Sequence, residues 1–125
     1  MVFKESVLKA ADNSGARLLR CIQVVGRSVA REGDFIIVSA IRVRPGKKVQ
    51  KGKVYKAVVV QCRKTDLRSF GHSVEFRSNR AVLIRKSEGR RSEPLPVGSR
   101  INKVLSFRLR TRLLTKLILI SAGQL

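Results

Sequence analysis

Short apolar runs, each bounded by turn-forming residues, divide most of the chain and constrain its fold more than any other feature of the sequence. The run at 54–62 has the strongest strand character, because its β-branched side chains pack well on a pleated surface. The run at 18–25 is apolar enough to predict a strand buried on both faces. Further strands are expected at 6–10, 35–43, 74–76 and 81–84. Many short strands joined by turns predict a mainly β fold, closed or nearly closed into a barrel that leaves no exposed sheet edge.

Turn formers predict where the chain reverses. Asp12-Asn13-Ser14-Gly15 should turn the chain after the first strand, and Gly33-Asp34 should interrupt it before the third. Gly71 marks a further turn. The last two predicted strands are expected to form a hairpin around Ser78-Asn79.

The chain changes character after position 96. The segment 97–125 contains no acidic residue, and its leucines recur at four-residue spacing as Leu105, Leu109 and Leu113. This apolar stripe predicts a short helix docked on the barrel. A packed helix alone would leave three arginines without acidic partners, namely Arg108, Arg110 and Arg112. We expect one domain, 1–125, in which about 1–96 form the barrel with its ribbon and 97–125 form a C-terminal segment with one or two short helices.

The charge balance predicts the kind of partner. The chain has 28 Lys and Arg against 8 Asp and Glu, which gives a net charge of +20. Such a surface repels itself and indicates a permanent polyanionic partner, for which nucleic acid is the best match. A membrane surface is the alternative, but no basic amphipathic helix with an aromatic face is recognisable. Hydrophobic residues make up 43% of the chain, which is enough apolar surface for a folded domain.

Clusters of basic residues are the candidate RNA contacts. The connection at 42–56 contains Pro45-Gly46 and Gly52 and no acid, so it is predicted to project as a ribbon whose side chains reach phosphates on either side. Aromatic residues are few, so phosphate and groove contacts with folded RNA are expected over base stacking. The candidate RNA-binding residues are Arg42, Arg44, Lys47, Lys48, Lys51, Lys53, Lys56, Arg63, Lys64, Arg68, Arg85, Lys86, Arg90, Arg91, Arg108, Arg110 and Arg112.

The sequence offers no constellation for catalysis. His72 is the only histidine, and it follows Gly71 in a predicted turn where it should be exposed. The acids are scattered, and no phosphate-cradling GxxxxGK[ST] motif occurs. Cys21 and Cys62 lie in apolar runs without a CxxC motif and are expected to be buried reduced thiols, although a disulfide between two core strands stays open. The sequence therefore predicts no enzyme, no metal site and no cofactor.

Membrane insertion and secretion are not predicted either. No stretch approaches the roughly 18 apolar residues of a membrane span. The first ten residues lack the apolar core of a secretory signal. We expect a soluble protein without a membrane partner.

Motifs in the same order as those of a known family span almost the whole chain. The first is Ala11-Asp12-Asn13-Ser14-Gly15-Ala16-Arg17, followed by Cys21-Ile22-Gln23-Val24. The second is Ala57-Val58-Val59-Val60, followed by Gly71, Phe76, Asn79, Val82 and Leu83. The third is Gly98-Ser99-Arg100-Ile101, followed by Leu109-Arg110 and Lys116. Together they resemble the universal large-subunit ribosomal protein fourteen family of bacterial or organellar type.

The resemblance implies a five-stranded β-barrel with a projecting β-ribbon and short C-terminal helices. Members of the family lie at the subunit interface, where they bind large-subunit rRNA, touch neighbouring large-subunit proteins and bridge to small-subunit rRNA. A ribosome-silencing factor docks on a Gly-Thr-Arg sequence and a later Lys. These positions correspond here to Ser99, Arg100 and Lys116, with Ser in place of Thr.

Several positions depart from the family pattern. Phe70 stands where Asp, Asn or Ser usually precedes the glycine, Arg108 stands where Glu is common, and the loop at 28–32 is shortened. Lost acids and gained arginines indicate a divergent organellar ribosome. The mitochondrial ribosome is the first expectation, with another organellar or a bacterial ribosome as the alternative.

Two classes of function are compatible with these features. The first is a permanent structural constituent of the large ribosomal subunit, which the ordered motifs favour. The second is a free RNA-binding assembly or regulatory factor that shares only the barrel.

Overall fold

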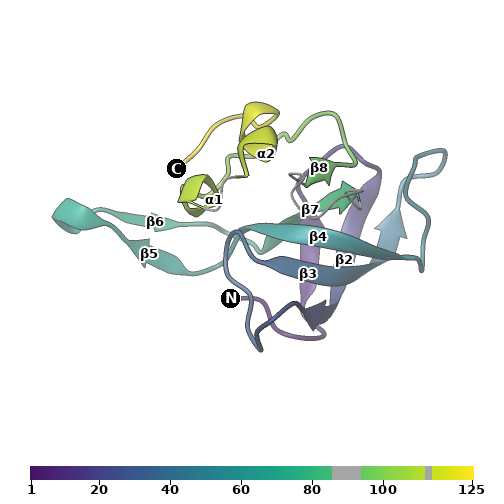
Figure 1. Cartoon of the computed structure of the whole chain (residues 1–125), viewed down its shortest axis with the longest axis horizontal. Helices are drawn as coiled ribbons and strands as arrows, with labels where there is room; N and C mark the ends of the chain where they lie inside the picture. Colours follow the sequence, from purple (N-terminus) through teal and green to yellow (C-terminus); the bar gives the residue numbers. More distant parts are fainter. Residues whose placement is uncertain (86–93, 112–113) are drawn as a thin grey trace.

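The computed structural model describes residues 1–85, 94–111 and 114–125, which form a barrel, a projecting ribbon and a helical C-terminal segment (Figure 1). The strands are β1 (Val7–Ala10), β2 (Ala16–Val24), β3 (Phe35–Val43), β4 (Val54–Gln61), β5 (Thr65–Leu67), β6 (Ser73–Glu75), β7 (Arg80–Arg85) and β8 (Leu95–Pro96). The helical segments are η1 (Ser69–Gly71), α1 (Arg108–Thr111) and α2 (Thr115–Leu119). Within the described ranges, no helix has the length and apolar character needed to cross a membrane.

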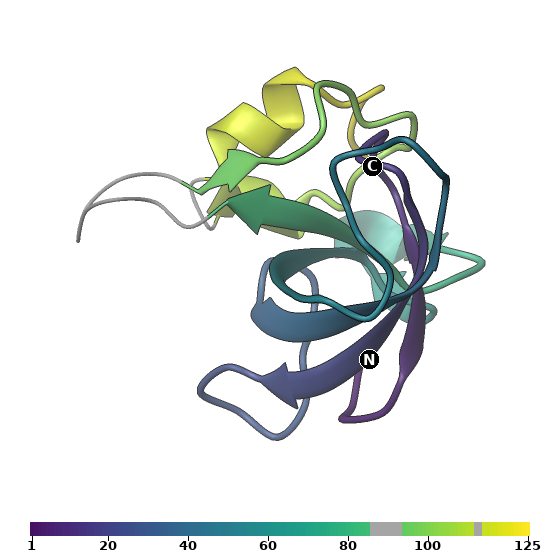
Figure 2. The same cartoon turned by 90° about the vertical axis from the view of Figure 1, so that its right-hand side faces the viewer.

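Five strands close into a barrel in the order β1-β2-β3-β4-β7, and β8 extends one edge of β7. The neighbouring pairs are antiparallel except at the closure, where β1 runs parallel to β7 with Lys9 opposite Arg80. Figure 2 looks toward one end of the barrel, from which the connection between β3 and β4 projects. The predicted mainly β fold and the five-stranded barrel implied by the family resemblance are both confirmed.

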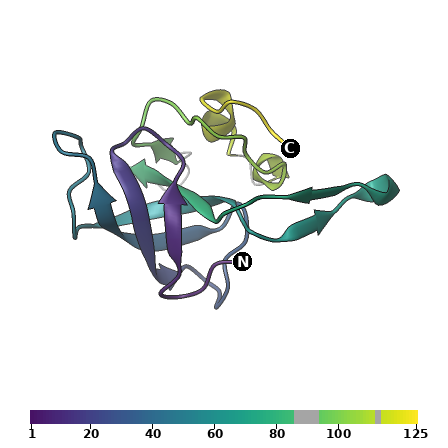
Figure 3. The ribbon, with the colours of Figure 1, turned by 180° about the vertical axis from the view of Figure 1, so that it is seen from behind.

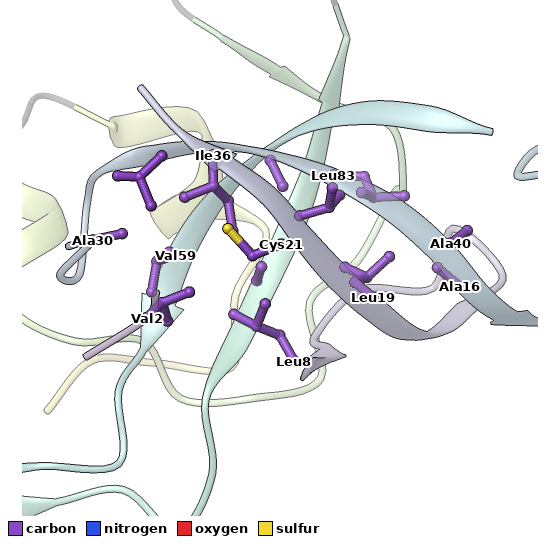
Figure 4. Packing of buried hydrophobic residues seen from close by; sticks show 14 of the residues in the cluster. Val2, Leu8, Ala16, Leu19, Cys21, Ala30, Ile36, Ala40, Val59 and Leu83 are labelled. Carbon is purple, nitrogen blue, oxygen red and sulfur yellow. The ribbon is translucent and has the colours of Figure 1, made fainter. Parts of the chain in front are cut away.

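The barrel interior is filled by side chains that alternate along each strand (Figure 4). In β2, Leu19 and Cys21 are buried while Arg20 between them is exposed, and a register shift after Cys21 makes Val24 the next buried position. The prediction that 18–25 is buried on both faces is therefore wrong. The reason is that the described residues of the C-terminal segment cover the outer faces of strands other than β2, so the outer face of β2 has no such cover from them.

A second core lies outside the barrel, between the C-terminal segment and strands β4 and β7. Alternation along β4 sends Ala57 and Val59 into the barrel and Val58 and Val60 outward into this second core. The stretch 57–60 is continuously apolar because these two cores bury both faces of this part of the strand. The C-terminal residues packed there are Ile101, Leu105, Leu109, Leu114 and Leu117.

The leucine stripe does not lie on one helix. Leu105 precedes α1 in an extended segment, where its backbone nitrogen donates a hydrogen bond to the Gly123 carbonyl at 2.9 Å. Leu109 lies in α1, and the third predicted member of the stripe, Leu113, is outside the described residues. The prediction of one or two short C-terminal helices is confirmed as two.

Strands β5 and β6 pair only with each other, and they project from the end of the barrel opposite the connection at 44–53 (Figures 1 and 3). The sequence misplaced this ribbon, because 44–53 consists of turns and bends without a strand. The predicted hairpin around Ser78-Asn79 is also wrong, since β6 pairs with β5 while β7 pairs with β4. Asn79 instead joins the ribbon to the barrel: its side-chain oxygen accepts a hydrogen bond from the Arg63 backbone nitrogen at 2.7 Å.

Both cysteines are buried and free. The prediction of buried reduced thiols is confirmed for this structure. Burial raises the pKa of Cys62 to about 11 and also raises the pKa of Cys21. A thiol with so high a pKa stays protonated near neutral pH, so Cys62 is a poor nucleophile.

Candidate nucleic-acid interface

A groove of about 580 Å³ at the end of the barrel that carries the 44–53 connection has a lining rich in basic residues. Strand pairing brings these cations together. Arg42, near the end of β3, pairs with Leu18 of β2, whose preceding residue is Arg17. The parallel closure adds Lys9 and Arg80, which face each other on β1 and β7. The basic residues that line the groove are Lys9, Arg17, Arg42, Arg44, Lys47 and Arg80.

The turn between β1 and β2 supports the connection at 44–53. The Arg44 backbone nitrogen donates a hydrogen bond to the Gly15 carbonyl at 2.8 Å. Gly15 has a φ of +109°, and a Cβ placed on it would lie only 2.3 Å from the Cβ of Lys47. Only glycine allows the backbone of the turn and the side chain of Lys47 to approach so closely. The predicted turn at 12–15 thus fixes the position of a cation in the groove.

A second groove of about 480 Å³ adjoins the first and includes Lys47, Lys48, Arg85 and Ser99. Asn13 holds the loop that contains Ser99 against the turn. Its side-chain oxygen accepts hydrogen bonds from the backbone nitrogens of Ser99 at 2.9 Å and Arg100 at 3.1 Å, and its side-chain nitrogen donates to the Ser99 hydroxyl at 3.0 Å. The segments around Asn13, Lys47 and Ser99 therefore form one continuous surface. A further groove of about 300 Å³ adds Lys51 beside Arg17, Arg42 and Arg44.

We call this surface the basic end; its cations are Lys9, Arg17, Arg42, Arg44, Lys47, Lys48, Lys51, Arg80 and Arg85. Within 1–85, 94–111 and 114–125, none of them forms a salt bridge with a carboxylate. Among the described residues, Asp12 is the one acid in the lining of these grooves, and its carboxylate accepts hydrogen bonds from the Ser14 hydroxyl at 2.8 Å and the Leu83 backbone nitrogen at 3.4 Å. Burial raises the pKa of Asp12. The basic end is therefore suited to an anionic ligand.

The predicted RNA-binding residues do not all lie on this surface. Lys53 and Lys56 are exposed near the start of β4, and Lys56 lies 4.9 Å from the centroid of the Phe35 ring. Arg63 and Lys64 are exposed near the root of the ribbon, and Arg110 is exposed on α1. The structure places Arg42, Arg44, Lys47, Lys48, Lys51 and Arg85 on the basic end. Four further predicted residues, Lys86, Arg90, Arg91 and Arg112, lie outside the described residues.

Arg68 and Arg108 have partners within the chain. The Arg108 guanidinium donates hydrogen bonds to both oxygens of Asp66, at 2.7 and 3.3 Å, and Arg68 donates to the same carboxylate at 3.2 Å. The hydrogen bond from Arg108 lowers the pKa of Asp66. The sequence prediction that Arg108 lacks an acidic partner is wrong, because folding brings Asp66 to it from 42 positions away. These contacts connect the ribbon to the C-terminal segment.

Ser99, Arg100 and Lys116 are all exposed. Ser99 lies beside the cations of the basic end, whereas Lys116 lies on α2. The two segments meet where the Ile101 backbone nitrogen donates a hydrogen bond to the Ile120 carbonyl at 3.0 Å. Lys116 is about one helical turn before Ile120, so Arg100 and Lys116 lie on neighbouring segments.

Three cations of the basic end were not among the predicted site residues, namely Lys9, Arg17 and Arg80. Arg17 directly follows the predicted turn and could have been found from its place at a strand start beside that turn. Lys9 and Arg80 meet only through the parallel closure of the barrel, for which no local pattern exists. Asn13 was noted as a turn former, but its role in fixing the loop at 98–100 depends on the tertiary structure.

The described residues offer little support for metal binding or for catalysis. No group of three or more His, Cys, Asp or Glu side chains in these residues could hold a metal ion. His72 is exposed next to Gly71 at the ribbon tip, as predicted.

Comparison with known proteins shows the family to which this chain belongs. A family model described as ribosomal protein L14p/L23e matches residues 1–124 of the 125-residue chain. The match includes the barrel, the ribbon, the helices and every segment of the basic end. The chain therefore belongs to the ribosomal protein L14p/L23e family and is a large-subunit ribosomal protein with a structural role.

Proposed function

We propose that the chain binds large-subunit rRNA through its basic end and lies at the subunit interface. There it contributes to intersubunit bridges by contacting small-subunit rRNA, and it also contacts neighbouring large-subunit proteins. The observation that carries rRNA binding is the set of cations on the basic end without carboxylate partners in the described residues. Such cations match a phosphate backbone, because each neutralised phosphate releases condensed counterions. This role requires positioning and charge neutralisation, and it requires no catalytic group. The subunit interface and the bridges rest on the family resemblance.

A mitochondrial ribosome is the proposed location. The support is the excess of arginine and the scarcity of acids relative to the family pattern, including Arg108 where Glu is common. Arg108 pairs with Asp66, so this substitution also has a structural role in holding the ribbon.

Replacing Lys47, Lys48 and Lys51 together by Ala tests the proposed RNA contact. The triple variant should bind large-subunit rRNA more weakly. The slope of log affinity against log salt should flatten by nearly one unit for each lost phosphate contact. Filter binding at several salt concentrations measures this slope.

A matched triple variant, Lys4→Ala, Arg20→Ala and Arg31→Ala, serves as the control. It removes the same charge from exposed positions outside the basic end. Its salt slope should stay closer to that of the unmodified chain. Equal slopes for the two triple variants would contradict the assignment of the basic end to RNA.

We also propose that Ser99, Arg100 and Lys116 receive a ribosome-silencing factor. Exposed cations on a protein-facing surface favour an acidic partner and mainly govern association rate and specificity. The proximity of Ser99 to Lys47 and Lys48 also fits the alternative that this patch binds rRNA.

Charge reversal separates these readings. The variant Arg100→Glu with Lys116→Glu should lose binding of the factor while entering the large subunit normally, which sedimentation and a pull-down on the same variant measure. Lys4→Glu with Arg31→Glu is the charge-matched control and should preserve both. Loss of incorporation in the Arg100 and Lys116 variant would favour rRNA contact, and retained factor binding would exclude docking at this patch.

A further inference from the structure

The tip of the ribbon exposes two large apolar side chains. Phe70 is 97% exposed and Leu67 is 81% exposed. The tip, formed by η1 between β5 and β6, projects far from the barrel (Figure 3). Within the described residues, neither side chain is covered by another part of the chain.

The backbone at the tip disfavours a bulky residue at position 70. Phe70 has φ 66° and ψ 24°, and Gly71 also has a positive φ of 77°. Two consecutive positive φ values are typical of type I′ hairpin turns, which prefer Asn-Gly. A side chain such as Phe is strained in this region, whereas Asn is tolerated. Neither local conformation nor burial within the chain explains the phenylalanine.

The ribbon is held against the C-terminal segment by residues close to its tip. Arg68 donates hydrogen bonds to Asp66 and, at 2.9 Å, to the main-chain oxygen of Leu125, and its guanidinium lies 5.4 Å from the centroid of the Phe107 ring. Asp66 is held in turn by Arg108. An isolated two-stranded hairpin is only marginally stable, so these contacts give the tip a defined direction.

The charges near the tip favour protein over RNA. Strands β5 and β6 with their connection carry Asp66 and Glu75 against Arg68, in a chain whose net charge is +20. The guanidinium of Arg68 is already engaged. Sites that stack single-stranded bases combine aromatic rings with a positively charged groove, and the tip does not provide this combination.

We propose that Leu67 and Phe70 form an apolar anchor that inserts into an apolar pocket of a neighbouring protein in the large subunit. This inference rests on the proposed function, because residence in the subunit supplies the neighbour. Buried aromatic anchors contribute strongly to protein interfaces, and insertion offsets the strain of Phe70 in the free chain.

A photo-crosslinker tests the identity of the partner. The chain with p-benzoylphenylalanine at position 70 is incorporated into large subunits and irradiated, and the adducts are identified by mass spectrometry. We expect an adduct with apolar residues of one neighbouring protein. An adduct with rRNA, or no adduct in subunits that contain the chain, would overturn the proposal. Failure of the chain to enter large subunits would instead count against the proposed function.

The variant Phe70→Asn tests the anchor itself. In the free chain it should be at least as stable as the unmodified protein, because Asn suits the type I′ turn. In competition with the unmodified chain for subunits that lack it, the variant should be incorporated about tenfold less well or worse. The control variant is Leu119→Asn. Leu119 lies on α2 and is as exposed as Leu67, at 81%, so this variant should compete normally. Equal competition by Phe70→Asn would overturn the anchor, and a loss of stability in the free chain would indicate a structural role for Phe70.

Discussion

Substitution of Gly15 by Ala should lower the free energy of unfolding by about 2–6 kcal/mol and move Lys47 out of the basic end. Two costs combine. The backbone at Gly15 has a φ of +109°, where a residue with a Cβ is strained, and the added methyl group would lie 2.3 Å from the Cβ and 2.8 Å from the Cγ of Lys47. Chemical denaturation measures the first effect. The loss of rRNA affinity at fixed salt measures the second.

Gly46→Ala is the matched control for this prediction. Gly46 also has a positive φ, +73°, and lies in the connection that contains Lys47, but nothing lies within 4 Å of a Cβ placed on it. The Gly46→Ala variant should lose only the free energy of the backbone strain, about 1 kcal/mol. If both variants lose the same stability, the contact between Gly15 and Lys47 is not a rigid element of the fold.

Leu109→Ala should destabilise the chain by about 2–5 kcal/mol, because Leu109 is fully buried in the second core, between α1 and the outer face of the barrel. The cavity should first loosen the C-terminal segment. That segment carries Arg108, which holds Asp66 in β5 of the ribbon, so the ribbon should loosen with it. Chemical denaturation reports the stability, and limited proteolysis with hydrogen exchange reports where protection is lost.

Leu119→Ala removes the same atoms from an exposed position on α2 and should change the stability by less than about 0.5 kcal/mol. In Leu109→Ala, exchange in β2 and β3 should be affected less than exchange in the C-terminal segment, since these strands contribute to the interior core of the barrel. Uniform loss of protection would contradict the division into two cores.

The sequence by itself determined the positions of most strands and turns, because these depend on local patterns. The observed bounds of β3 coincide with the predicted run at 35–43, and β4 departs by one residue from the run at 54–62. The turn at 12–15 and the exposed His72 were likewise predictable from neighbouring residue types. The excess of cations was enough to predict an anionic partner, since every Lys and Arg is visible without knowledge of the fold.

Only the tertiary structure decided which strands meet and which cations share a surface. The parallel closure that pairs Lys9 with Arg80 joins segments far apart in sequence, and alternation within a strand carries no information about its neighbour. The same holds for the ribbon, whose place at β5 and β6 follows from pairing rather than from lysine content. Asp66 shows the consequence for the candidate site: a carboxylate 42 positions away engages Arg108, whereas the cations of the basic end meet no such partner in the described residues. Charge is a property of each residue, but pairing of charges depends on long-range geometry.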